Sequence, residues 1–264
     1  MQETTHRALK TIKALPEGYP GTFDNPEREH VPDDVVRRTL PFMIPMLRAM
    51  VVIQWLTGMR PSEVVGMRVG QIDQTSDSEF WYYTLKQHKT EKHIGKKLIP
   101  LGKAEQELIA PYLSGKEPES AVFCPHTAMQ EHKAQRLAAR KTKIVPSQEA
   151  RAKANAAKPS KYREFYTPDS YRKAIIHAIK KANKHLPEGE KIPHWFPYQL
   201  RHSTATALTK VLGKALAQAQ AQLGHTKSKM TENYAKDATL EIMEELARNR
   251  RNPFDTDGQD KDAA

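Results

Sequence analysis

The residues with the clearest chemical potential lie near the end of the chain, between positions 198 and 234. Arg201 and His202 stand together where a helix is expected to start, His225 follows a glycine, and Tyr234 comes nine residues later. These groups make a poor site for a divalent metal, which takes carboxylate oxygens or a His/Cys cage. They suit a phosphate, because arginine binds it through paired hydrogen bonds. A tyrosine beside such a pocket is a candidate covalent nucleophile.

Composition indicates a polyanionic partner in a reducing compartment. The 264 residues carry a net charge of +11 and have a pI near 9.6, which is typical of nucleic-acid-binding proteins. No apolar run is long enough to span a bilayer, and the first residues lack the apolar core of a signal peptide. The single cysteine, Cys124, excludes an internal disulfide. We therefore expect a cytoplasmic protein, associated with the nucleoid if the host is bacterial.

A further arginine lies at an expected turn between two helices. The apolar segment MLRAMVVIQWLTG predicts a helix that ends at Gly58, and Pro61 and Glu63 suit the first turn of the next one. Arg60 is thereby held between two helices, which pre-organises a side chain that is otherwise flexible. Taken alone, an arginine before a proline at a helix start is most often a solvated surface residue.

Two segments resemble the tyrosine recombinases, the phage-integrase family. TGMRPSEVVGMRVGQID is similar to the family's first arginine motif, and LRHSTATAL followed by LGHTKSKMTENYA is similar to its C-terminal signature. The resemblance runs from about residue 31 to 243, with a poorly matching interior from about 124 to 166. It implies the family's catalytic-domain fold, mainly α with a small antiparallel β-hairpin or sheet (α+β), and a reaction without metal or cofactor.

The resemblance also assigns roles to individual residues. Arg60 and Arg201 would clamp the phosphate, His225 would donate a hydrogen bond to it, and Tyr234 would be the nucleophile. Glu63 matches the acidic position that supports the first arginine in the family. A plain N-terminal charge on the helix is the alternative for Glu63.

The family's catalytic lysine lies in a β-hairpin, and this sequence offers several candidates. EFWYYTLKQHKT and KKLIPL predict two antiparallel strands joined by a charged tip. Lys89 is the best match to the lysine that reaches the scissile phosphate. A slip of one register would favour Lys86 or Lys92 instead. Most lysines of this hairpin must simply be solvated.

At one position the sequence departs from the family pattern. The family has His-x-x-Arg, whereas this chain has Tyr198 three residues before Arg201. A phenol hydrogen-bonds a phosphate but does not accept a proton near neutral pH as imidazole does. The general base is therefore unassigned, and His194 could stand in for it. We assign His202 to the helix-start framework in preference to a direct role.

The domain organisation follows from shifts in composition. Residues 1–31 read as a linker or tail, too short for the separate DNA-clamping domain that family members usually carry. Residues 32–250 form the expected catalytic domain. Within it, residues 126–165 are rich in Ala, Lys and Arg and are expected to be disordered or marginally helical, as a DNA-binding arm or a solvated insertion. A helix at about 238–250 passes to a neighbouring subunit or folds back, and residues 251–264 read as a disordered tail.

These observations predict a DNA strand-breaking and rejoining enzyme. It would be a site-specific recombinase or integrase of a mobile genetic element, acting on double-stranded DNA as a dimer or tetramer through a 3′-phosphotyrosyl intermediate. A type IB topoisomerase would share the chemistry. A catalytically inactive DNA-binding regulator is the third possibility, supported by Tyr198. For a metal-dependent nuclease the sequence offers no carboxylate triad.

Overall fold

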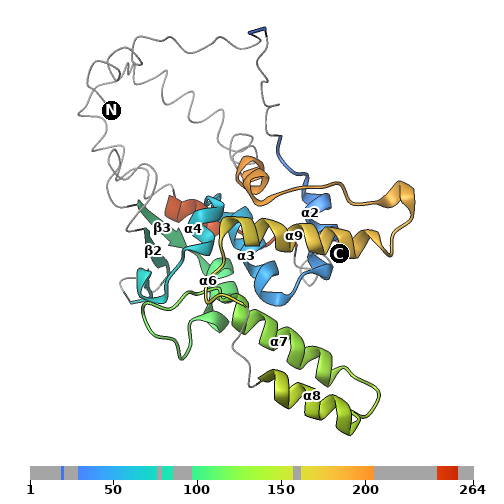
Figure 1. Cartoon of the computed structure of the whole chain (residues 1–264). Helices are drawn as coiled ribbons and strands as arrows, with labels where there is room; N and C mark the ends of the chain where they lie inside the picture. Colours follow the sequence, from blue (N-terminus) through green and yellow to red (C-terminus); the bar gives the residue numbers. More distant parts are fainter. Residues whose placement is uncertain are drawn as a thin grey trace, which may run out of the picture.

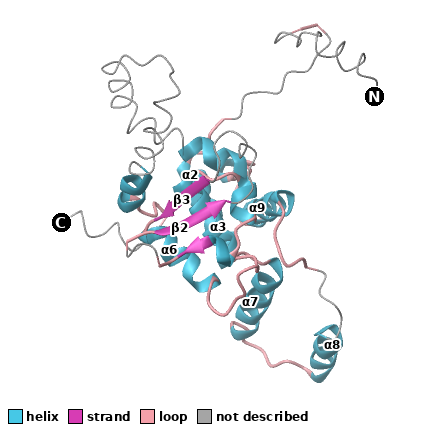
Figure 2. Cartoon of the chain, turned by 90° about the vertical axis from the view of Figure 1, so that its left-hand side faces the viewer, coloured by secondary structure: helices cyan, strands magenta, loops and turns pink. Residues whose placement is uncertain are grey.

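The structure is a computed structural model that describes residues 19–20, 29–75, 79–85, 97–156, 162–204 and 243–254. One small antiparallel sheet lies along one side of a helical body, and two further helices project from this body (Figures 1 and 2). The predicted fold class, mainly α with a small antiparallel sheet, is confirmed. No helix among the described residues has the length and apolarity to cross a membrane.

Of the three described N-terminal helices, the two on either side of Arg60 end and begin where the sequence predicts. Helix α2 (Asp33–Thr39) has its two aspartates in the first turn, where they complement the helix dipole. Helix α3 (Pro45–Thr57) is buried on several sides and ends at Gly58, whose φ of 64° is the left-handed conformation that glycine adopts without steric cost. Helix α4 (Pro61–Val65) then starts with its proline at the first position. The turn that carries Arg60 is therefore fixed by the end of α3 before it and by the start of α4 after it.

The sheet has one more strand than the sequence predicts. Strands β1 (Ile72–Asp73), β2 (Trp81–Leu85) and β3 (Lys97–Leu101) are antiparallel in the order β1-β2-β3. The β2–β3 hairpin is as expected, with Tyr83 opposite Ile99. Strand β1 was not predicted, because two residues are too few to show the alternation by which a strand is recognised.

The remaining described helices follow the sheet. They are α6 (Lys103–Ile109), α7 (Pro125–Ala138), α8 (Pro146–Ala156) and α9 (Pro168–Asn183), with short 3-10 turns at Leu40–Phe42, Val69–Gln71, Ala110–Tyr112 and Glu188–Glu190. In α9 the Thr167 hydroxyl accepts the Ser170 N–H, as an N-cap does. The buried face of α9 includes Tyr171, Ile175, Ala178 and Ile179. This helix packs on α2, α3 and α4 and closes the core.

Helices α7 and α8 occupy most of the segment for which disorder was one expectation. They project from the body at the end opposite the helix of residues 197–204, which is orange in Figure 1. Described side chains from Lys133 to Asn155 are exposed. We refer to α7, α8 and their connection as the arm.

The described C-terminal segment folds back on its own domain. Residues 243–249 are helical, and Ala247 in their middle is 1% exposed. The Ala247 carbonyl oxygen lies 2.2 Å from the position of a Cβ on residue 102, so this approach requires Gly102. The adjacent Arg250 donates to the buried Glu105 at 2.9 Å. Burial raises the pKa of Glu105, although Arg250 opposes the shift.

The left-handed glycine at the end of α3 yields the first prediction. Gly58→Ala places a methyl group in a left-handed backbone, at a cost of about 1–2 kcal/mol, and 3.2 Å from Thr204 Cγ2. Gly115 has a φ of 71° but nothing within 4 Å of an added Cβ. We expect Gly58→Ala to lower the free energy of unfolding more than Gly115→Ala does, measured by urea denaturation. Equal losses would show that the contact with Thr204 contributes nothing.

Candidate active site

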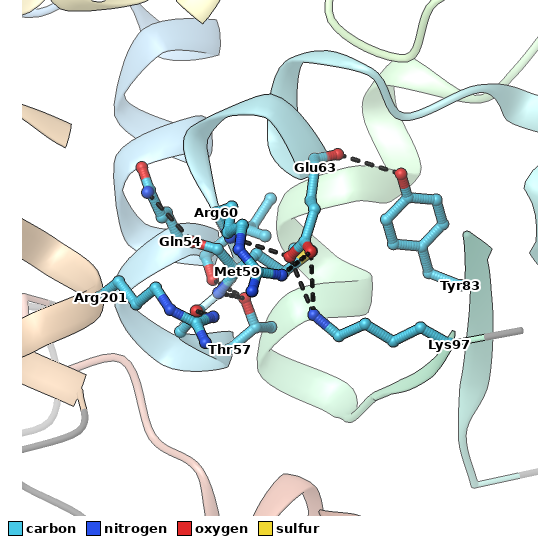
Figure 3. Close-up of polar contacts among 10 residues, drawn as sticks. Gln54, Thr57, Met59, Arg60, Glu63, Tyr83, Lys97 and Arg201 are labelled. Atoms are coloured by element: carbon cyan, nitrogen blue, oxygen red, sulfur yellow. Dashed lines mark hydrogen bonds and ion pairs between the residues drawn. The ribbon is translucent and has the colours of Figure 1, made fainter. Parts of the chain in front are cut away.

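The turn after α3 presents Arg60 together with a carboxylate that holds it. The Arg60 backbone N–H donates to Glu63 Oε2 at 2.9 Å, and Arg60 Nη1 donates to Glu63 Oε1 at 3.0 Å. One carboxylate therefore fixes both the backbone and the guanidinium of the same residue (Figure 3). This geometry leaves the other guanidinium nitrogens available to a ligand.

Glu63 also binds a lysine from the sheet. Its side chain is buried, at 4% exposure, and Lys97 Nζ donates to its two oxygens at 2.9 and 3.1 Å. The Tyr83 hydroxyl donates to the Glu63 backbone carbonyl at 3.0 Å. Glu63 thus joins α4 to β2 and β3. It does more than supply a charge at a helix start.

The protonation equilibria of this cluster reflect burial and charge together. Burial alone would raise the pKa of the Glu63 carboxyl, but hydrogen bonds from the Arg60 N–H and the Lys97 ammonium outweigh it and hold that pKa below its usual value. Burial lowers the pKa of Lys97; Glu63 opposes this shift, whereas Arg201 and Arg60 add to it. The carboxylate is ionised at neutral pH, among three cations.

Arg201 reaches the same turn from the far end of the sequence. Its Nη1 donates to the Gly58 carbonyl at 2.6 Å, across 143 residues of chain. The buried Gln54 amide donates to the Met59 carbonyl at 3.1 Å and to the Pro197 carbonyl at 3.0 Å. Thr204 Oγ1 donates to the Trp55 carbonyl at 2.5 Å. The two arginines that the resemblance assigned to the phosphate therefore lie at one turn.

Other predicted residues stand beside this cluster or outside the described ranges. Tyr198 and His202 are neighbours on one helix, with ring centroids 5.5 Å apart. His202 Nε2 is buried and has no hydrogen-bond partner among the described residues. His194 is exposed, with its ring 6.4 Å from Phe196. The residues outside the described ranges are Lys86, Lys89, Lys92, His225 and Tyr234, and their roles stay predictions.

Lys97 is the site residue that the sequence interpretation missed, because the lysines that match the family pattern lie at the tip of the hairpin and Lys97 lies at its base. A usable signal exists in the alternation of β3. Lys97, Ile99 and Leu101 share one face of the strand, and Ile99 and Leu101 are buried. A lysine in line with two core residues must point inward and find a carboxylate.

No metal site accompanies the cluster within the described part of the chain. There, no group of three or more His, Cys, Asp or Glu side chains is arranged to hold an ion. The charged groups that do converge are cations around one buried acid, which is a setting for an anionic ligand.

Comparison with known proteins decides the family. The model of the phage integrase family matches residues 33–241, which is most of the chain. The chain belongs to the phage integrase family. The family prediction made from the two motifs is confirmed.

Family members of known structure share low identity with this chain. The XerH site-specific recombinase, in a post-cleavage complex with its palindromic difH substrate, is 18% identical and aligns with 90% of this chain at a TM-score of 0.42. A Tn1549 transposon integrase in complex with a circular intermediate DNA is also 18% identical, with 84% coverage and a TM-score of 0.44. This chain spans 57% of the XerH chain and 67% of the integrase chain. No curated protein matches the sequence significantly.

The lowered pKa of Glu63 yields a prediction about acid stability. Its ion pairs stabilise the fold above the pKa of the unfolded carboxyl, near 4.5, and this stabilisation is lost as the pH falls through the lower folded pKa. We expect Glu63→Gln to lower the free energy of unfolding by about 2 kcal/mol at pH 7, the size of a charge-assisted hydrogen bond. The difference from wild type shrinks below pH 4.5.

Thermal unfolding between pH 3 and 8 measures this difference. Glu119→Gln is the matched control, because Glu119 is exposed. A Glu63→Gln deficit that stays constant down to pH 3 would contradict the assignment of the stability to the ionised carboxylate.

Proposed function

We propose that this protein cuts and rejoins double-stranded DNA as a site-specific recombinase, by transesterification through a tyrosine and without a metal. The observation that carries the proposal is the hydrogen bond from Arg201 to the Gly58 carbonyl. It brings the arginines of two separate motifs to one turn, and two guanidinium groups at one place suit a phosphodiester. Membership of the phage integrase family supports the same reading.

In the proposed reaction the Tyr234 phenol gives its proton to water or to the base that the sequence leaves unassigned, and its oxygen attacks the phosphorus of a DNA phosphodiester. The bond to the 5′ oxygen breaks, which leaves a 3′-phosphotyrosyl ester and a free 5′-hydroxyl. Arg60, Arg201 and His225 neutralise the charge that develops on the non-bridging oxygens. Lys89 protonates the departing 5′ oxygen as general acid. The ester preserves the bond energy, so the 5′-hydroxyl of a second strand reverses the step without ATP.

One observation favours a second candidate, a catalytically inactive DNA-binding regulator. Tyr198 stands where the family pattern has a histidine, and a phenol does not serve as a base near neutral pH. A regulator would retain the arginine cluster for phosphate binding and lose the chemistry. A type IB topoisomerase would keep the chemistry and relax DNA as a monomer.

A nicked suicide DNA substrate tests the chemistry. Because the short cleaved fragment diffuses away, wild type should accumulate a covalent protein–DNA adduct visible by denaturing gel, and Tyr234→Phe should form none. Arg60→Ala and Arg201→Ala should each slow adduct formation by about 100- to 1,000-fold, the usual cost of one transition-state donor. An adduct that survives Tyr234→Phe excludes Tyr234 as nucleophile, and absence of an adduct in wild type selects the regulator.

An assay on supercoiled plasmid distinguishes a topoisomerase from a recombinase. Relaxation at protein concentrations where the chain is monomeric would identify a topoisomerase. Strand exchange between two sites would identify a recombinase.

We also propose that protomers associate on DNA through the C-terminal helix. The segment 243–254 lies on its own domain, held by the Arg250–Glu105 pair and by the close approach of Ala247 to Gly102. The Tyr82 hydroxyl adds a hydrogen bond to Glu244 at 3.1 Å. The surface around Gly102 and Glu105, which we call the seat, would accept this helix from a neighbouring copy. The contacts are the same whether one chain or two supply them.

A single methyl group tests this assembly. Gly102→Ala places a Cβ 2.2 Å from the Ala247 carbonyl oxygen, so it should exclude the helix from the seat whichever chain supplies it. We expect Gly102→Ala to bind one site on DNA as wild type does but to lose the complex of paired protomers, measured by analytical ultracentrifugation. Gly189→Ala is the control, with nothing within 4 Å of the added group. Unchanged assembly of Gly102→Ala would exclude this seat.

The arm supplies a second surface suited to DNA. The arm, residues 125–156, contains seven basic and two acidic residues, which account for five of the eleven net positive charges of the chain. Among the salt bridges of the described residues, none involves the exposed Lys133 or Arg136 of α7, or Arg140 in the connection to α8. Unpaired cations on a projecting element favour a polyanion. The arm therefore suits a contact with the DNA backbone away from the phosphodiester that is cleaved.

A further inference from the structure

The charge balance around Glu63 is unusual for a pocket meant to bind an anion. Its buried carboxylate lies within hydrogen-bond distance of Arg60, one of the two proposed phosphate clamps. A carboxylate paired only with Arg60 would cancel the charge of that clamp and repel an incoming phosphate. In this chain a second cation, Lys97, occupies both oxygens of the same carboxylate.

We propose that Lys97 is a positioning residue for the recombination reaction: it neutralises Glu63, so that Glu63 can orient Arg60 without consuming its positive charge. This inference rests on the proposed function and adds a residue to it. With Lys97 present, Arg60, Lys97 and Glu63 together carry one net positive charge, and Arg201 adds another. Without Lys97, the Arg60–Glu63 pair is neutral.

The position of Lys97 in the sheet gives its contact a second consequence. It is the first residue of β3 and directly follows the hairpin segment 86–96 that contains Lys89. Its ammonium is anchored on α4 through Glu63 (Figure 3). The base of the hairpin is thereby tied to the Arg60 turn, and this tie would align the proposed general acid with the proposed clamp.

The geometry favours positioning over proton donation by Lys97 itself. An ammonium has three N–H donors, and Lys97 directs hydrogen bonds at both oxygens of Glu63. Only about a quarter of its side chain is exposed, at 26%. A proton donor to the 5′ oxygen would have to leave this carboxylate during the reaction.

A charge-balance cycle tests the proposal. The variants are Lys97→Met, Lys97→Arg, Glu63→Gln and the double variant Lys97→Met/Glu63→Gln, with the exposed Lys180→Met as matched control. Each is assayed in single-turnover adduct formation on two suicide substrates. One has the natural 5′ oxygen at the scissile position, and the other has a bridging 5′ sulfur, which departs as a thiolate without a proton.

We expect Lys97→Met to slow adduct formation on the order of 10- to 100-fold, the size typical of groups that orient a directly contacting residue. The loss should be equal on both substrates. Lys97→Arg should retain most of the rate, since it keeps the charge. The double variant should be faster than Lys97→Met alone, because removal of the carboxylate removes the need for its neutralisation.

Three results would overturn this assignment. Rescue of Lys97→Met by the sulfur substrate would make Lys97 the proton donor. A double variant as slow as Lys97→Met would show that Glu63 is not what Lys97 serves. Loss of the rate in Lys97→Arg would show that charge is not its contribution.

Thermal unfolding of every variant keeps a folding defect separate from these readouts. If Lys97→Met alone fails to fold, the comparison of Glu63→Gln with the double variant still decides, since Lys97 should be dispensable once the carboxylate is gone. An absence of adduct in wild type on both substrates would overturn the proposed function and this inference together. An adduct in wild type without rescue in the double variant would overturn this inference alone.

Discussion

The hydrogen bond between the Arg201 guanidinium and the Gly58 carbonyl is the contact on which the arrangement of the site depends. The left-handed conformation of Gly58 ends α3, so that the chain can turn into α4 with Arg60 between the two helices. Gln54, with no exposed surface, reinforces the contact by bridging the carbonyls of Met59 and Pro197. An arginine that binds a carbonyl is held in one rotamer before any ligand arrives, which reduces the entropy lost on binding.

Electrostatics set a second constraint. A pocket for a phosphodiester needs uncompensated positive charge, whereas a half-buried cluster of cations is unstable without an acid among them. Glu63 resolves this conflict, because its single carboxylate contacts two cations and leaves an excess of positive charge. The arrangement combines rigidity with charge, and it does so by joining three elements, α4, β2 and β3, at one residue.

The sequence identified the parts of the site whose signals are local. The end of α3 at Gly58 and the start of α4 at Pro61 each follow from a few adjacent residues, and both agree with the structure. The convergence of Arg60 and Arg201 was inferred from family resemblance, since no local pattern specifies a contact across 143 residues. Lys97 escaped notice because its role depends on a carboxylate 34 residues earlier in the chain. Residues 125–156 form helices even though their composition offers little apolar surface to bury, a case in which composition left the outcome open.

The bridge across the two arginine motifs has a consequence for biosynthesis. Arg60 belongs to the first quarter of the polypeptide, yet its guanidinium partner arrives only with residues 197–204. A chain emerging from the ribosome, or one truncated by proteolysis before that helix, carries Arg60 without the second arginine that the fold brings to the same turn. The pairing of the two arginines therefore forms late in synthesis, after the helix that carries Arg201 has been made.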